Sequence, residues 1–469
     1  MYFEHQTVKS GVDSMEKIRK FFISDWFTAI LIIAASVIVF TNNEIGGTIL
    51  FISVLGIVMA LCDDIMPALQ IVVLTTCFAI RCKHSYDDFI QFVWLAPPIA
   101  ILILSHFFIY RHKRDKVDPR KSGLFYGILA VSVATTLGGV GIISAGEYFS
   151  PTSVFYVFTL GFGMLIVYSY MSSALKIRDY SFTDKFAKMM VSIIIMLGIC
   201  VAEEYLSRLS ELSDGFDLLA FQWRNNASTM LMLAMPFAFY LSAKRFGWFF
   251  AGILSYVLIL LTGSRGGMLF GLVELGICFV TMFFLDKKHR LHIGLIFTGC
   301  LIIAFFLRGY IIDIVSYTID RLFSYDENKI RLELSYRGIN DFLSNPVFGR
   351  GLGYMGNNDV HNNAEFTLCW YHCSLVQVVG SFGITGIAAF AFLIYLRIKT
   401  FDKNRTFFNT MMFISYIGLE LMSLVNPGVF VPFPYLFLIT TYFVVMEKCN
   451  NDDDKAALSL IKSGNYGGK

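Results

Sequence analysis

Charged side chains are scarce in this chain: Asp, Glu, Lys and Arg together make up 16% of the 469 residues, whereas 56% are hydrophobic. A soluble globular domain usually carries about 25% charged residues, because its surface must be solvated. With so little charge and a mean hydropathy of +0.63, the composition excludes a soluble protein. It indicates a protein that lies in a membrane.

Several sequence signals are also absent. The first apolar run, Trp26–Phe40, is not followed by the small-residue pattern of a signal-peptide cleavage site, so we expect it to remain as a membrane anchor. No internal repeat with a fixed period is visible. Cys369 and Cys373 lie four residues apart, but no further Cys or His completes a zinc-ligand spacing. Most of the nine cysteines fall in or beside apolar runs, where a thiol is a small apolar filler.

Long apolar runs recur from Trp26 to Val445, and each is long enough to cross a bilayer core of about 30 Å. We therefore expect an all-α fold, a polytopic transmembrane helical bundle of about 12–14 spans with one large external loop that contains short helices. The fourteen predicted spans are 24–41, 47–62, 65–81, 89–110, 122–143, 153–173, 186–203, 226–243, 247–262, 267–285, 292–307, 374–396, 407–425 and 430–446.

The distribution of basic residues predicts the orientation of these spans. When the N-terminus is placed in the cytoplasm, the cytoplasmic segments hold 27 of the 38 Lys and Arg residues. Such an excess follows the positive-inside rule, so both termini are expected to be cytoplasmic and the long loop external. The resulting division is a cytoplasmic segment, eleven spans, the external loop, three spans and a cytoplasmic tail, at 1–23, 24–307, 308–373, 374–446 and 447–469.

The external segments carry the polar residues that could perform chemistry. In the long loop, the spacing predicts a helix over Leu332–Leu343, ended by an Asn-Pro pair and followed by a glycine-rich turn at 349–353. We expect this turn to bend the loop back over the membrane, with Arg337 on the helix face turned towards Arg265. The alternative for Arg337 is a solvated loop arginine. A second external segment, 203–226, has leucines spaced as in a short interfacial helix.

Arg265 lies in the sequence LTGSRGGML, at the expected outer end of a span. Gly263, Gly266 and Gly267 surround it and allow the backbone to approach a ligand closely. An arginine among exposed N–H groups at a helix start suits a phosphate or diphosphate. The alternative is an arginine that extends along the span to reach the water at the membrane boundary.

Two histidines in the long loop are candidates for proton transfer. His372 opens the run HCSLVQVVGSFGITGI, at the expected boundary between water and membrane. Imidazole accepts a proton near neutral pH, as activation of a sugar hydroxyl would require. His361, within VHNNAEF, has the same chemistry, and for either histidine a structural role is the alternative.

Three elements in this order resemble the O-antigen ligase/polymerase superfamily of bacterial membrane proteins. They are SRGG at the start of a span, R-x-x-x-x-F followed by NPVFGRGLGY, and H-x-x-L-x-Q-x-x-x-x-x-G-I-x-G. The resemblance covers about Asn225 to Ile387. Members commonly have His-Asn at the start of the last motif, where this chain has His372-Cys373; a His-Asn pair occurs instead at His361-Asn362. The number of residues between His372 and the Gly383–Gly386 turn matches the pattern of the family, which favours His372 as the family histidine.

The resemblance implies an inverting, metal-independent glycosyltransferase of the GT-C type, with no cofactor. It implies that arginines hold a diphosphate leaving group and that a histidine takes a proton from the acceptor hydroxyl. The catalytic residues would be His372, Arg265 and Arg337. Residues that bind the substrate would be Arg224, Ser264, Arg350 and His361. No metal ligands are expected, and the external loops contain no Asp-x-Asp sequence.

The implied donor is an undecaprenyl-diphosphate-linked oligosaccharide, used at the outer face of the bacterial cytoplasmic (inner) membrane. Other implied partners are a glycan acceptor, membrane lipid, a chain-length regulator and a flippase; no nucleic acid is implied. Polymerisation of repeat units into a surface polysaccharide (O-antigen, capsule or exopolysaccharide) is the first hypothesis. Ligation to a different acceptor, such as lipid A core or a wall polymer, is the second. A lipid-linked oligosaccharide flippase is the third, although a transport site would place more charges inside the spans.

Overall fold

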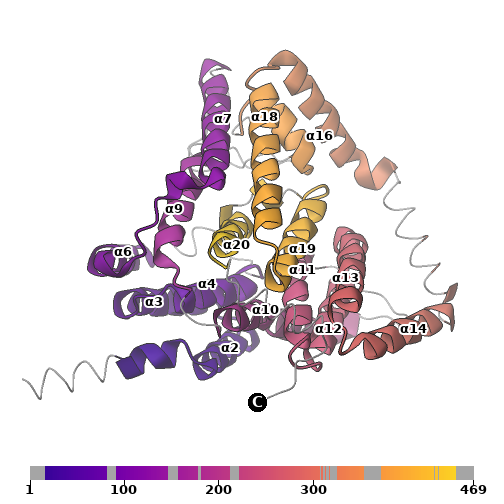
Figure 1. Cartoon of the computed structure of the whole chain (residues 1–469). Helices are drawn as coiled ribbons and strands as arrows, with labels where there is room; N and C mark the ends of the chain where they lie inside the picture. The colour runs from indigo at the N-terminus through magenta and orange to yellow at the C-terminus, as the bar shows by residue number, and fades with distance from the viewer. Residues whose placement is uncertain are drawn as a thin grey trace, which may run out of the picture. The chain divides into compact units, whose positions relative to one another are not determined.

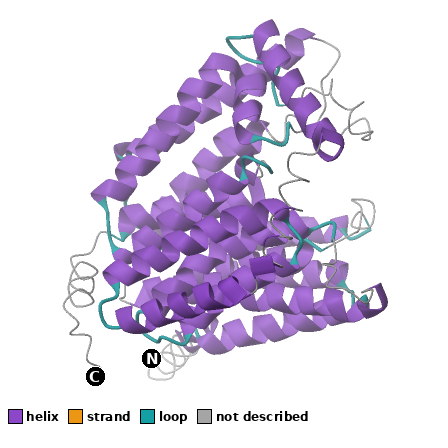
Figure 2. Cartoon of the chain, turned by 90° about the vertical axis from the view of Figure 1, so that its right-hand side faces the viewer, coloured by secondary structure: helices purple, strands orange, loops and turns teal. Residues whose placement is uncertain are grey.

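The computed structural model describes most of the chain in several stretches. These are residues 16–81, 91–145, 157–177, 181–211, 221–306, 325–352, 371–426, 428–430 and 432–449, with a few single positions between 308 and 316. Every regular element within these stretches is a helix (Figure 2). The expectation of an all-α polytopic bundle is therefore confirmed. The described helices form two compact units.

Unit 1 comprises residues 1–117, 172–241 and 247–264. Its α-helices are α2 (Asp25–Phe40), α3 (Glu44–Leu61), α4 (Met66–Ala79), α6 (Ala96–Ile109), α10 (Ser181–Ser207), α11 (Arg224–Ser242) and α12 (Trp248–Leu261). Short 3-10 turns lie at Val93–Leu95, Arg111–Lys113 and Leu209–Glu211.

Helix α10 is the centre of unit 1. It packs against α2, α4 and α12, and 72% of its most apolar window is buried inside the protein. Two ion pairs are buried in unit 1: the Lys176 ammonium lies 2.7 Å from the Asp63 carboxylate, and Arg81 forms an ion pair with Glu203. Pairing is required because an isolated charge is costly to bury.

Unit 2 comprises residues 118–171, 242–246 and 265–469. Its α-helices are α7 (Gly123–Ala145), α9 (Met164–Ala174, of which the last three residues belong to unit 1), α13 (Arg265–Leu285), α14 (Arg290–Phe306), α16 (Tyr325–Ser344), α18 (Ser374–Lys403), α19 (Phe407–Met422) and α20 (Phe437–Lys448). Single π-helical turns, η4 (Thr159–Gly163) and η7 (Pro432–Leu436), precede α9 and α20; 3-10 turns lie at Pro119–Lys121 (η3) and Gly428–Phe430 (η6).

Helix α18 organises unit 2, with α7 on one side and α16 on the other (Figure 1). Helices α7 and α18 pack closely because α7 presents glycine to its partner. A Cβ at Gly127 would lie 3.0 Å from the side chain of Leu393. In the same unit α13 packs against α19, so the helix that begins at Arg265 is held by the helix that follows α18.

A helix lies at each of the fourteen predicted spans, but many of these helices are short. By length and composition, four described helices can cross a membrane: Glu44–Leu61, Phe182–Ser207, Arg265–Leu285 and Ser374–Lys403. A fifth span results if Glu16–Phe22 and Asp25–Phe40, bent by 56°, are taken together. Two predicted spans, 153–173 and 430–446, are interrupted by the π-helical turns of η4 and η7. Hydropathy alone does not detect such turns, because apolar side chains continue through them.

The loop helix is longer than predicted. The sequence predicted a helix over Leu332–Leu343, and α16 runs over Tyr325–Ser344, ending at the Asn-Pro pair as expected. In the other segment predicted to be external, α10 continues to Ser207 and a 3-10 turn follows at Leu209–Glu211, whereas residues 212–220 lie outside the described part. The predicted interfacial helix there stays a prediction.

Candidate functional site

Helix α18 is broken near its start, and the loop after α16 fills the break. Gly383 has φ 59° and ψ −150°, which no helix contains, so the backbone hydrogen bonding of the helix is interrupted there. The freed N–H of Ile384 donates instead to the carbonyl of Pro346 at 2.8 Å. On the other side of the break, the carbonyl of Gly380 accepts from the N–H of Arg350 at 2.9 Å.

We call this contact between residues 346–351 and residues 380–385 the interlock. It explains why glycines occur in the GRG sequence. Gly349 has φ +68°, and a Cβ there would overlap the backbone of Ser381 and Phe382. At Gly383 a Cβ would lie 2.5 Å from the carbonyl oxygen of Pro346. Only glycine combines a left-handed backbone with so close an approach. The glycine-rich turn therefore locks α16 onto α18, which is a more specific role than the predicted bend in the loop.

Helix α16 itself contacts the first part of α18. A Cβ at Gly338 would lie 3.1 Å from the ring of Tyr371 and would overlap Val376. Across the contact, a Cβ at Gly380 would lie 3.0 Å from the carbonyl oxygen of Gly338. Two facing glycines thus bring the backbones of the two elements together, with Leu334 buried beside them.

A buried carboxylate joins the two elements. The hydroxyl of Tyr371 donates to Asp341 of α16 at 2.6 Å, and the guanidinium Nε of Arg350 lies 3.8 Å from the same carboxylate. Burial raises the pKa of Asp341, although the Tyr371 hydrogen bond, Arg350 and Arg337 each act in the opposite direction. A proton or a cation near this carboxylate is therefore favoured.

His372 follows directly after this anchored tyrosine. The N–H of Tyr371 donates to the side-chain oxygen of Gln377 at 3.0 Å, and the amide of Gln377 donates to Ser381 at 2.8 Å. His372 has a left-handed backbone with φ 55°, which is uncommon outside glycine. Two residues later, the N–H of Ser374 donates to the carbonyl of Ser423, after α19. The half-buried imidazole is thus carried by a backbone held on both sides.

The two loop arginines flank this histidine-bearing turn from α16 and from the interlock. Arg337, on α16, is half-buried and forms an ion pair of 2.7 Å with Glu333, one helical turn earlier. It immediately precedes Gly338, which touches Tyr371. Arg350 sits in the interlock and faces Asp341. Both arginines therefore act on Asp341, and His372 follows the tyrosine that binds Asp341. We call this meeting of Arg337, Arg350 and the backbone of His372 around the Asp341–Tyr371 contact the junction.

Arg265 is the first residue of α13, as the glycine pattern predicted. It is half-buried. A Cβ on the next residue, Gly266, would lie 2.7 Å from Val425 and 3.3 Å from Met422 at the end of α19. The starts of α13 and α18 thus both contact the same end of α19, since Ser423 also binds Ser374. That Arg337 faces Arg265 stays a prediction.

Two predicted substrate-binding residues belong to unit 1. Arg224 is half-buried at the start of α11. Ser264 is buried, and its hydroxyl donates to the side-chain oxygen of Asn225 at 2.8 Å. This bond brings the two predicted residues close together within that unit, at the start of α11.

Two further residues that the sequence analysis considered lie outside the described part of the chain. His361 and Cys369 fall in the stretch 353–370, outside the described residues. Within the stretches that the structure describes, no three His, Cys, Asp or Glu side chains come together as they would around a metal ion.

Sequence reasoning did not single out Asp341, Tyr371 or Gln377. Asp341 lies inside the R-x-x-x-x-F element and Gln377 inside the H-x-x-L-x-Q element, so both were quoted only as parts of a pattern. The sequence did contain one signal for Asp341: it is an acidic residue one helical turn after Arg337 in the predicted helix. Only the fold reveals that these side chains meet around Tyr371.

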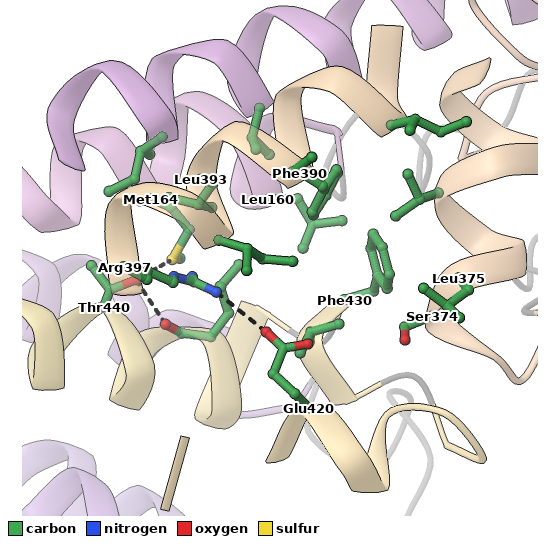
Figure 3. A pocket seen from close by; sticks show the side chains of 18 of the residues that line it. Leu160, Met164, Ser374, Leu375, Phe390, Leu393, Arg397, Glu420, Phe430 and Thr440 are labelled. Carbon is green, nitrogen blue, oxygen red and sulfur yellow. Dashed lines mark hydrogen bonds and ion pairs between the residues drawn. The ribbon is translucent and has the colours of Figure 1, made fainter. Parts of the chain in front are cut away.

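An apolar cavity of about 320 Å³ lies next to this junction, within unit 2 (Figure 3). Both parts of α18 line it, together with α7, α9, α19 and α20. Ser374 and Leu375 stand on one side of it, two and three residues after His372. On another side the guanidinium of Arg397 lies 3.5 Å from the carboxylate of Glu420, and most of the other lining residues are aliphatic or aromatic.

Residues 249–391 match the model of a protein family described as O-antigen ligase. The match confirms the resemblance to the O-antigen ligase/polymerase superfamily that the three motifs indicated. The matched segment contains Arg265, the α16–α18 interlock and His372, whereas Arg224 precedes it. No curated protein matches the chain.

Proposed function

We propose that this protein transfers a glycan from an undecaprenyl-diphosphate-linked donor to a second glycan, and that it polymerises repeat units of a surface polysaccharide. The observation that supports this most is the junction of Arg337, Arg350 and His372, built by the interlock inside the family domain. We place the reaction at the outer face of the bacterial inner membrane, in the orientation that the Lys and Arg distribution predicts.

In the proposed reaction, His372 accepts the proton of an acceptor hydroxyl, while the oxygen of this hydroxyl forms a bond to the anomeric carbon of the donor sugar. The bond between that carbon and the diphosphate oxygen breaks, with inversion at the carbon. The electron pair leaves with undecaprenyl diphosphate. Arg265 and Arg337 offset the charge that develops on this leaving group, in place of a metal ion. Arg224, Ser264, Arg350 and His361 hold the substrates.

Ligation of the lipid-linked glycan to a different acceptor is the second candidate. It uses the same donor and the same residues, and the family description, O-antigen ligase, is the observation in its favour. The acceptor distinguishes the two reactions, so the decisive assay offers both.

The test uses purified full-length protein with a synthetic undecaprenyl-diphosphate-linked repeat unit. Polymerisation produces a ladder spaced by one repeat unit without a further acceptor. Ligation produces a single product, and only when a lipid A core or wall-polymer acceptor is added. No product under either condition, with the lipid-linked glycan moved across proteoliposome membranes instead, would refute transfer and indicate a flippase.

Arg265→Ala serves as the site-directed arm of this assay. Loss of a charge-assisted contact to a diphosphate should lower the rate on the order of a hundredfold. Arg265→Lys should restore part of the rate, because an ammonium replaces a bidentate fork. Arg290→Ala is the matched control, since Arg290 also begins a helix of unit 2 but binds backbone carbonyls of α13. Wild-type turnover in Arg265→Ala would overturn the role of this residue.

A further inference from the structure

Helix α16 has an apolar surface on each of two opposite faces. One face packs on α18: Leu334 is fully buried, Gly338 touches Tyr371, and Asp341 binds the same tyrosine. That face accounts for the attachment of the helix to unit 2. It leaves the other face to be explained.

The opposite face carries four large apolar side chains, Leu332, Tyr336, Ile339 and Leu343. Spacings of four, three and four residues place them in one line along the helix. They are exposed, with relative exposures of 43%, 68%, 49% and 68%. A helix facing water would carry polar residues along this line. We call these four residues the α16 stripe.

The α16 stripe continues onto a membrane span. Beyond the end of α16, Val347 and Phe348 are also exposed, at 50% and 42%. The carbonyls of Pro346 and Val347 accept hydrogen bonds of 2.8 and 3.1 Å from Ile384 and Thr385, where the second part of α18 begins. Ile384 is 55% exposed.

Exposed apolar side chains therefore lie on the loop helix, on the segment that follows it and, at Ile384, on a helix that is long and apolar enough to cross a membrane. The exposed surface of a membrane-spanning helix faces lipid hydrocarbon. The α16 stripe, which lies next to this helix at the membrane boundary, would meet the same lipid.

We propose that the α16 stripe is a membrane-binding surface, seated among the acyl chains just below the headgroups of one leaflet. Tyr336 suits this level, because tyrosine combines an apolar ring with a polar hydroxyl. Lys329 and Arg331 lie exposed on the same helix, where they can meet lipid phosphates. On this basis the helix that presents Arg337 is held at the membrane surface, where, if the proposed function holds, the diphosphate of a lipid-linked donor arrives.

Photo-crosslinking in lipid nanodiscs tests the proposal. Benzoylphenylalanine is introduced singly at Tyr336, at Leu343 and at Asn340, and irradiated full-length protein is analysed by mass spectrometry. Asn340 is the matched control, because it is exposed on the same helix but off the line of the α16 stripe. Leu272 of α13, 53% exposed on a candidate span, is the positive control for contact with lipid.

We expect phospholipid adducts at Tyr336 and Leu343 in yields similar to those at Leu272, and roughly tenfold less at Asn340. A crosslinked dimer would instead assign this surface to a second copy of the chain and overturn the proposal. Adducts at Leu272 but none at Tyr336 and Leu343 would overturn it as well, since the face would then meet water. The readout requires no turnover, so it stands apart from the test of glycan transfer.

Discussion

At the scale of single residues, the site depends on a strained histidine between two fixed neighbours. A left-handed backbone costs a residue with a side chain roughly 1 kcal/mol, so it persists only where the surroundings enforce it. Here Tyr371 is held by Asp341 and Gln377, and Ser374 is held by Ser423. The backbone of His372 is therefore held in place before any substrate binds.

Replacement of the two loop histidines separates their roles. We expect His372→Ala to stop glycan transfer and to leave binding of the lipid-linked donor nearly unchanged, because proton removal contributes only as the acceptor attacks. His361→Ala should be mild. Both variants are compared in one turnover assay with a fluorescent lipid-linked substrate, alongside a direct binding measurement. An inactive His361→Ala with an active His372→Ala would exchange the two assignments, and activity in both would exclude histidine as the base.

Asp341 predicts a pH dependence of stability. Burial raises its pKa in the folded protein, so the neutral carboxyl stabilises the fold below its unfolded pKa of about 4. That contribution is lost as the pH rises through the raised folded value. The side-chain amide of the Asp341→Asn variant would still accept the Tyr371 hydrogen bond but would not titrate.

We therefore expect the melting temperature of the wild type, relative to Asp341→Asn, to fall as the pH rises from about 4 to about 7. The measurement is a thermal unfolding series of both proteins in the same detergent. Comparison of the two proteins cancels the titration of groups that they share. A difference that is constant with pH, or of opposite slope, would contradict the assignment of a raised pKa.

At the scale of elements, the break in α18 and the loop after α16 form one unit of structure. Neither could exist alone, because each leaves backbone groups that the other satisfies: Pro346 and Val347 accept from the span, and Arg350 and Gly351 donate to it. The motif NPVFGRG and the motif G-I-x-G are therefore two halves of one contact. This contact is a structural reason why both motifs occur in the same chain.

Gly349→Ala tests this contact. A methyl group at Gly349 would overlap the backbone of Ser381, and the left-handed φ adds strain, so we expect a loss of about 2 kcal/mol or more in stability and a loss of transfer. Gly276→Ala is the control, because a Cβ at Gly276 in α13 would meet nothing within 4 Å. Thermal unfolding and turnover of both variants are measured together. Equal behaviour of the two variants would refute the interlock.

At the scale of the whole molecule, charge is placed sparingly. The ion pairs Lys176–Asp63 and Arg397–Glu420 lie among apolar side chains. Glu274 is buried in α13, and among the described residues neither of its carboxylate oxygens has a hydrogen-bond partner. The cationic groups that the proposed reaction needs come from the starts of helices and from the loop, not from the middle of spans. This distribution favours chemistry at a membrane surface over passage of a charged substrate through the bundle.

The same distribution predicts the response to chelation. Turnover should survive EDTA, because neither an Asp-x-Asp sequence in the external loops nor a described group of three ligands offers a divalent cation a site. The assay compares purified protein before and after EDTA treatment, with Mg²⁺ and Mn²⁺ added back. Activity that is lost with EDTA and restored by either ion would refute the metal-free reaction. Attention would then turn to Asp313, Asp320 and Asp326 of the long loop.

The sequence alone determined the class of this protein and the place of its helices, and it supplied the candidate residues for its chemistry. Long continuous apolar runs indicate helices in lipid, because there the backbone groups must form hydrogen bonds within their own segment. Arg265 and His372 became candidates because each stands at the start of an apolar run, and Arg337 because it lies in the long polar loop. The helix α16 ends at its Asn-Pro pair as expected.

The tertiary structure alone decided what these residues touch. The break at Gly383, the partnership of Asp341 with Tyr371, and the π-helical turns within two predicted spans depend on contacts between segments distant in sequence. Periodicity is blind to such contacts, because it reports only how neighbouring residues share a face. A carboxylate one turn after an arginine has the same local pattern in water and in a packed junction, and only the packing gives it a partner.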